Sequence, residues 1–100
     1  MNRLIVAPRA EGHIKRISAW WRANRSGAPE LFATELADAL ELLPTNPSLG
    51  VGYAERRGVA IRRLLLPRSR YHIYFSYDEA GGLIEVRAVW HAVRGRGPSL

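Results

Sequence analysis

The first half of the chain carries apolar residues at a helical period. Residues 3–7 form a short, mostly apolar run, ended by Pro8, that predicts a first strand. From residue 10 to residue 24, apolar side chains recur at steps of three and four, which predicts a helix with one buried stripe. A second such repeat begins near Pro29, which suits the first turn of a helix, and stops at Pro44. The short connection between the repeats predicts an antiparallel helical hairpin.

The second half alternates between apolar and polar side chains, which predicts strands. After a loop at residues 44–52 that is rich in Pro, Gly and Ser, residues 61–66 form a predicted strand ended by a proline. Residues 71–77 and 84–91 predict two half-buried strands around a glycine-containing turn, followed by an irregular tail. The segment Leu64–Leu66 is apolar on both sides, so its strand is either central in the sheet or covered by a partner.

These elements predict a single domain over residues 1–100 with an α+β fold. Its expected architecture is a small, mostly antiparallel β-sheet with an N-terminal strand and an antiparallel helical hairpin packed on one face. Trp20 and Trp21 of the first helix are expected at the core and its rim. His13 lies among polar neighbours, so we expect its side chain to be solvated.

The excess positive charge lies almost entirely in the second half. The chain has a net charge of +6, of which residues 1–50 contribute +1 and residues 51–100 contribute +5. All but one of the 15 basic residues are arginines, whose forked guanidinium suits phosphate or carboxylate recognition. A G+C-rich genome would also favour arginine over lysine, but it would not explain the clustering. The basic half therefore predicts an anionic partner, either nucleic acid or an acidic protein segment.

The composition excludes several kinds of site. The chain has no cysteine, so it can form neither a disulfide nor a thiolate metal site. Three scattered histidines without an i, i+4 pair do not predict a metal site either, and no cofactor motif is present. The apolar run at residues 4–7 is too short for a signal sequence or a membrane span. We therefore expect a cytoplasmic protein without metal, cofactor or membrane segment.

The last two predicted strands define a cationic face. If their alternating core residues face the same side, Tyr77 pairs with Ile84 and Tyr71 with Trp90. The opposite face then brings together five polar side chains: Arg70, His72, Tyr74, Arg87 and His91. Arginines of the preceding strand could join them, and further arginines follow in the tail.

Such a face can bind phosphate through its guanidinium groups or perform acid–base chemistry through an imidazole. RNA cleavage needs a base, an acid and fixed positive charge. The expected catalytic residues of a ribonuclease are His91, His72, Arg63, Arg70 and Arg87. The expected binding residues are Arg62, Arg63, Arg68, Arg70, Tyr74, Arg94 and Arg96. Surface strands also carry Arg, His and Tyr simply because they face water, and this alternative stays open.

Four segments resemble the RelE/ParE superfamily, the toxins of bacterial type II toxin–antitoxin systems. They are an N-terminal strand followed by APRAEGHIKRISAWW, the helix end LELLPTNPSLG, the core RRLLLPRSRYHIYFSY and the closing VRAVWHAVRG. Each motif is short, but their order and spacing cover nearly the whole chain. The resemblance implies a growth-inhibiting toxin of the plasmid-stabilisation type, held inactive in a hetero-oligomer by a cognate acidic antitoxin.

The superfamily has two branches with different targets. RelE-like members cleave mRNA on the ribosome, whereas ParE-like members poison DNA gyrase. Where the nuclease branch commonly has a Tyr-Arg-Leu pattern, this chain has Tyr71-His72-Ile73, and the lysines of the preceding strand are missing. His91 nevertheless falls near a position that some nucleases use for catalysis. The resemblance favours a ParE-like gyrase poison, with a RelE-like endoribonuclease acting on ribosome and mRNA as the alternative.

Overall fold

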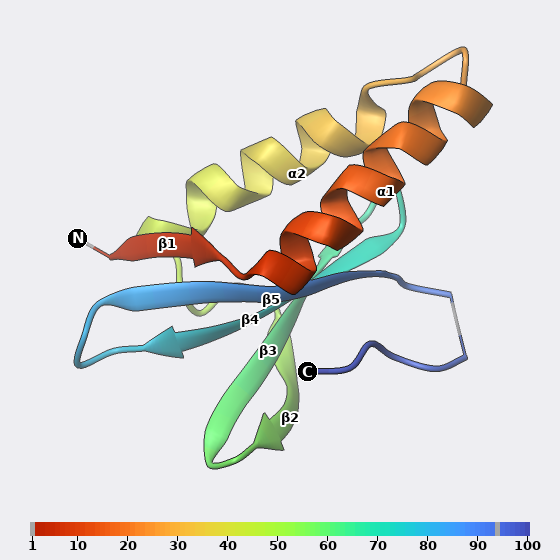
Figure 1. Cartoon of the computed structure of the whole chain (residues 1–100). Helices are drawn as coiled ribbons and strands as arrows, with labels where there is room; N and C mark the ends of the chain where they lie inside the picture. Colours follow the sequence, from red (N-terminus) through yellow and green to blue (C-terminus); the bar gives the residue numbers. More distant parts are fainter. Residues whose placement is uncertain (1, 94) are drawn as a thin grey trace.

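The computed structural model describes residues 2–93 and 95–100 (Figure 1). Within these residues the chain forms a five-stranded sheet and two α-helices. In chain order the elements are β1 (Arg3–Val6), α1 (Pro8–Asn24), α2 (Leu31–Leu42), the 3₁₀ turn η1 (Leu43–Thr45), β2 (Val51–Arg56), β3 (Val59–Leu66), β4 (Tyr71–Asp78) and β5 (Leu83–His91). No helix in the described part of the chain is long and apolar enough to cross a membrane.

The strands lie in the order β1-β5-β4-β3-β2. The β1–β5 pair is parallel and the other three pairs are antiparallel, so the sheet is mixed but mostly antiparallel, as predicted. Both helices lie over the same face of this sheet (Figure 1). The strand containing Leu64–Leu66 is an inner one, between β4 and β2, but Leu65 is 39% exposed, so the alternative that a partner covers one side of it stays open.

Strand β2 was not predicted from the sequence. Its stretch Val51–Arg56 contains Gly52 and a bulge between Gly52 and Ala54, so its side chains do not follow a regular alternation. The strand is also at the edge of the sheet and largely exposed, which removes the apolar signal of a buried strand. A two-residue turn, Arg57-Gly58, joins β2 to β3 with positive φ at both residues, which is a type I′ hairpin turn.

The main core lies between the helices and the sheet. Ile73 and Phe75 of β4 and Val86 of β5 are fully buried there against Phe32 of α2. Burying such a side chain contributes about 1.5–3 kcal/mol, so this layer supplies most of the driving force for folding. The helical and strand periods of these residues were correctly predicted, although α2 begins at Leu31, two residues after the expected proline.

A smaller apolar cluster lies on the opposite face of the sheet, which we call the open face. Its buried members are Ile61, Tyr74 and Ala88, and Leu100 packs against them from the tail. The tail contains no helix or strand among its described residues, as predicted, and it folds back across this face (Figure 1). The Trp90 indole N–H donates to the Arg96 carbonyl at 2.8 Å, which fixes the start of that return.

Glu35 of α2 holds the turn between β3 and β4. Its carboxylate accepts hydrogen bonds from the Arg68 N–H at 2.8 Å and from the Ser69 N–H and hydroxyl at 2.8 and 2.6 Å. Burial by itself raises the pKa of the Glu35 carboxyl. The hydrogen bonds and the Arg68 charge together outweigh burial, so the pKa is lowered from its ordinary value. This interaction connects the helical layer to the turn that carries Arg70.

Replacing Glu35 with Gln should destabilise the fold, because the amide cannot accept all three hydrogen bonds. We expect a loss of about 1–2 kcal/mol in the free energy of unfolding, measured by urea denaturation. The matched control is Glu41→Gln, an exposed residue of the same helix, which should change stability by less than about 0.5 kcal/mol. Equal stability of the two variants would contradict the role assigned to Glu35.

Candidate functional site

A β-bulge in the β4–β5 hairpin changes which residues share a face. Tyr77 pairs with Ile84, as predicted, but the register shifts by one residue between Tyr74 and Phe75. Arg87 is the extra residue of β5 at this shift. Beyond it the predicted pairs are wrong: Tyr74 pairs with Ala88, Ile73 with Val89, His72 with Trp90 and Tyr71 with His91.

The bulge divides the predicted cationic cluster between the two sides of the sheet. His91 shares the helix-covered face with Tyr71, whose ring it meets edge-on at 5.0 Å. His72 shares the open face with Tyr74, at a ring distance of 5.9 Å. Burial lowers the pKa of His72, and the charges of Arg63 and Arg70 lower it further. The expectation that both imidazoles line one surface is therefore wrong.

The arginines of the predicted cluster are divided as well. Arg87 is on the open face, where it donates to the Ser76 hydroxyl at 3.1 Å and pairs with Glu85 at 3.3 Å. Arg63 lies on the same face, with its guanidinium 5.1 Å from the Tyr53 ring centre. Arg96 lies in the returning tail, and Arg94, another predicted binding residue, lies outside the described residues.

Arg62 has an intramolecular role. Its guanidinium donates to the backbone carbonyls of Ser48, Leu49 and Gly50, with donor–acceptor distances of 2.6–3.2 Å. Because it opposes Phe75 in the sheet register, it points away from the face that Arg63 occupies. These bonds anchor the loop that leads into β2, so Arg62 is engaged within the fold rather than presented to a ligand.

The remaining predicted residues meet in a groove of about 1000 Å³ beside α1. Arg68, Arg70 and His91 line it from the sheet side, where β4 begins and β5 ends. Arg16 of α1 and Arg25, which directly follows α1, line it from the helical side. Three tryptophans also line it: Trp20 and Trp21 of α1 and Trp90 of β5. None of the described residues that line the groove is acidic. The groove therefore combines concentrated positive charge with aromatic surface.

The backbone of Arg70 is strained. Its φ is 69°, in the left-handed region that favours glycine or asparagine, and a side chain there costs about 1–2 kcal/mol. The conformation is held from both sides, because the Arg70 N–H bonds the Leu66 carbonyl and the Arg70 carbonyl accepts from the Ala92 N–H, each at 2.8 Å. An arginine at such a position makes its guanidinium a candidate for a functional role.

Two of the three tryptophans that line the groove come from α1. Trp21 is buried and donates its indole N–H to the Tyr71 hydroxyl at 3.3 Å, whereas Trp20 is 44% exposed. The prediction of one core and one rim tryptophan is confirmed. The Arg25 guanidinium lies 4.9 Å from the Trp20 ring centre, so the exposed ring also contacts a cation. Exposed Trp and Arg side chains are enriched among the residues that dominate protein interfaces.

His13 is buried rather than solvated, which corrects the sequence-based expectation. Its Nδ1 accepts a hydrogen bond from the Val89 N–H at 3.2 Å, and its ring packs edge-on against Trp90. Burial lowers the pKa of His13, and the nearby charges of Arg16 and Arg9 lower it further. The neutral imidazole thus forms part of the groove floor and joins α1 to β5.

The α1 side of the groove was missed from the sequence, although a signal was present. Arg16, Trp20 and Trp21 lie within a stretch of six residues, and Arg25 follows at a four-residue step from Trp21. Steps of four place side chains on one side of a helix, so an arginine–tryptophan surface could have been predicted. The pattern alone could not predict that the turn carrying Arg70, which is distant from α1 in the sequence, lines the same groove.

A comparison with family models assigns residues 4–95 to the ParE toxin of the type II toxin–antitoxin system parDE. The chain belongs to the ParE toxin family. It is therefore the toxin component of such a system, and membership in the family implies an antitoxin partner. No curated protein matches the chain.

Acidification should destabilise this ParE-family toxin through His13. Since folding lowers the pKa of His13 below its ordinary value of 6.5, the unfolded chain binds more protons than the folded one just below that pH. The melting temperature should therefore decrease as the pH is lowered from 7.5 to 5.5. His13→Asn, whose Oδ1 can replace Nδ1 as acceptor, should weaken this pH dependence and leave the share that belongs to His72. An unchanged pH dependence in that variant would exclude His13 as its source.

Proposed function

We propose that this ParE-family toxin arrests growth by poisoning DNA gyrase through binding, without chemistry of its own. The observation that carries the proposal is the separation of His72 and His91 onto opposite faces of the sheet. A ribonuclease needs a general base and a general acid that reach the same phosphate. Here the sheet itself lies between the two imidazoles, so they cannot act as such a pair.

The immediate surroundings of His91 also favour binding over catalysis. Its Nδ1 accepts a hydrogen bond from the Val93 N–H at 3.3 Å, and its ring packs on Tyr71. No carboxylate lines the groove among the described residues, so none is placed there to orient the ring or to take up its proton. Both contacts of the imidazole therefore serve packing at the end of β5.

We further propose that the groove beside α1 receives an acidic segment of the cognate antitoxin. Arg16, Arg25, Arg68 and Arg70 would attract its carboxylates, and Trp20 would supply an apolar anchor. A segment seated there would contact α1 and the end of β5 together. The helical hairpin and the tail, which we propose as the gyrase-contacting parts, would then be partly covered and the toxin held inactive.

The alternative target is mRNA on the ribosome. The observation in its favour is that Arg70 and His91 line the same groove, where arginines could hold a phosphate near one imidazole. This single-histidine arrangement makes a sharp prediction, because a RelE-like endoribonuclease of this kind would lose cleavage when His91 is replaced.

The purified toxin should inhibit DNA supercoiling by gyrase and accumulate cleaved DNA. His91→Ala should retain inhibition to within about twofold, because the binding mechanism needs no imidazole, and both should be measured by supercoiling and cleavage assays on plasmid DNA. Normal supercoiling at a stoichiometric excess of folded, growth-arresting toxin would reject gyrase as the target. Loss of mRNA cleavage on programmed ribosomes in His91→Ala would instead establish the alternative.

Removing groove side chains should weaken antitoxin binding. Trp20→Ala should lower the affinity for the antitoxin about 30-fold, as expected for an interface tryptophan. Arg70→Asn should also lower the affinity. Its melting temperature should be unchanged or higher, because asparagine tolerates the left-handed backbone. Isothermal titration calorimetry with the cognate antitoxin measures both. Arg22→Gln, on an exposed residue of α1 outside the groove lining, is the control. Equal affinities for control and groove variants would place the antitoxin elsewhere.

A further inference from the structure

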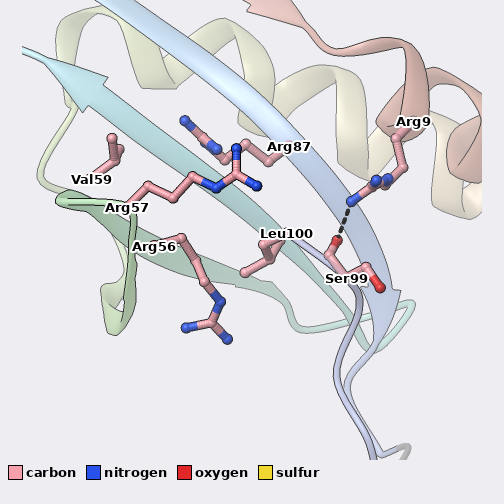
Figure 2. A pocket seen from close by; sticks show the side chains of 7 residues that line it. All are labelled: Arg9, Arg56, Arg57, Val59, Arg87, Ser99 and Leu100. Carbon is pink, nitrogen blue, oxygen red and sulfur yellow. Dashed lines mark hydrogen bonds between the residues drawn. The ribbon is translucent and has the colours of Figure 1, made fainter.

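A second hollow, of about 570 Å³, lies on the open face of the sheet. Four arginines line it: Arg9, Arg56, Arg57 and Arg87 (Figure 2). They come from the start of α1, the end of β2, the β2–β3 turn and β5, so the fold gathers them from distant parts of the sequence. The tail closes one side through Ser99 and Leu100. We call this hollow the four-arginine pocket.

Acidic side chains pair with few of the guanidinium groups of this pocket. Among the described residues, Glu85 is the only acidic side chain that forms a salt bridge with any of the four, and it pairs with Arg87 at 3.3 Å. Arg9 donates to the Ser99 carbonyl at 2.9 Å and Arg56 to the Glu55 carbonyl at 3.1 Å, which uses donors without supplying a negative charge. Figure 2 shows the Arg57 side chain extending toward that of Arg87. The Arg56 guanidinium points away from these two in the same view. An anion bound near Arg57 and Arg87 would relieve the repulsion between their like charges.

Arg57 occupies a position that folding alone would assign to another residue. Its φ is 54° and that of Gly58 is 79°, as in a type I′ turn whose first position prefers asparagine, aspartate or glycine. Over the described residues, Arg57 and Arg70 are the only non-glycine residues with positive φ. Both are arginines at tight turns, and each lines one of the two hollows. The strained turn therefore holds a guanidinium at the rim of the four-arginine pocket.

We propose that the four-arginine pocket binds the phosphodiester backbone of nucleic acid. Forked guanidinium groups match phosphate oxygens, and backbone recognition needs charge from several directions rather than apolar anchors. Only Val59 and Leu100 supply large apolar side chains to its lining, whereas the groove beside α1 has three tryptophans. An acidic peptide suits that groove, and a phosphate chain suits this pocket. The proposal is independent of which enzyme the toxin inhibits.

The test uses the full chain and a fluorescein-labelled 24-base-pair duplex of arbitrary sequence, followed by fluorescence anisotropy from 50 to 200 mM KCl. The test variant, Arg56→Gln with Arg57→Asn, removes two charges and places at the turn a residue that the type I′ geometry prefers. Arg3→Gln with Lys15→Gln removes the same charge from exposed positions outside the pocket lining and serves as the control. Melting temperatures verify that each variant is folded.

We expect the test variant to bind the duplex about tenfold more weakly at 100 mM KCl. The slope of log K against log salt should also become shallower by about one to two, as expected when one or two phosphate contacts are lost. The control should change both quantities much less. A single-stranded RNA of equal length separates the two sources of phosphate. If the test variant loses equal affinity for the RNA and the duplex, the pocket recognises any phosphodiester chain. If it loses affinity for the duplex alone, the pocket recognises DNA.

Two results would overturn the proposal. In the first, test and control variants weaken binding equally, so that the effect belongs to net charge and not to the pocket. In the second, a polyglutamate peptide at matched charge displaces the duplex from the wild-type toxin as well as unlabelled duplex does, and the test variant loses peptide binding in parallel. The pocket would then be a site for an acidic protein segment.

Discussion

The bulge at Arg87 is the constraint on which both layers of this toxin depend. Before it, β5 turns Ile84 and Val86 toward the helices; after it, Val89 takes that role and Ala88 joins the opposite cluster. One inserted residue thus lets a single strand serve two apolar layers. Without the shift, Val89 would leave the main core and His91 would move to the open face, so the core and the candidate site are decided together.

The same region explains why a histidine is buried in α1. Strand β1 pairs with β5 only as far as Val86, because Pro8 ends the strand and starts the helix. The next stretch of the β5 edge lacks a strand partner, and the His13 Nδ1 accepts the Val89 N–H there. A charged imidazole could not accept that bond, which is consistent with the lowered pKa of His13. The helix therefore satisfies one backbone donor of the sheet edge through a residue that also lines the groove.

Regular periods made most of the fold predictable, and departures from them account for the errors. The helices, β4 and the first half of β5 keep one apolar side throughout, so their buried faces followed from the sequence. In the stretch Ala88-Val89-Trp90 three apolar residues are consecutive, so the pattern allows either register. The bulge in β2 and the partner of His13 depend on neighbouring strands. The sequence predicted Arg68, Arg70 and His91 as site residues. It could not predict that His72 and Tyr74 lie on the other face, because that separation depends on the bulge.

The two strained arginines connect this architecture to the proposed functions. A left-handed arginine is less stable than an asparagine or glycine in the same turn, so both sequence choices oppose the local backbone preference. The cost can persist because Glu35 and the Leu66 and Ala92 backbone fix the turn of Arg70, while the β2–β3 hairpin fixes that of Arg57. Rigid turns then hold guanidinium groups at two hollows on opposite faces. Such pre-positioned charge suits the binding mechanism proposed above, and the bulge has separated the two imidazoles that a ribonuclease could have used as its acid and base.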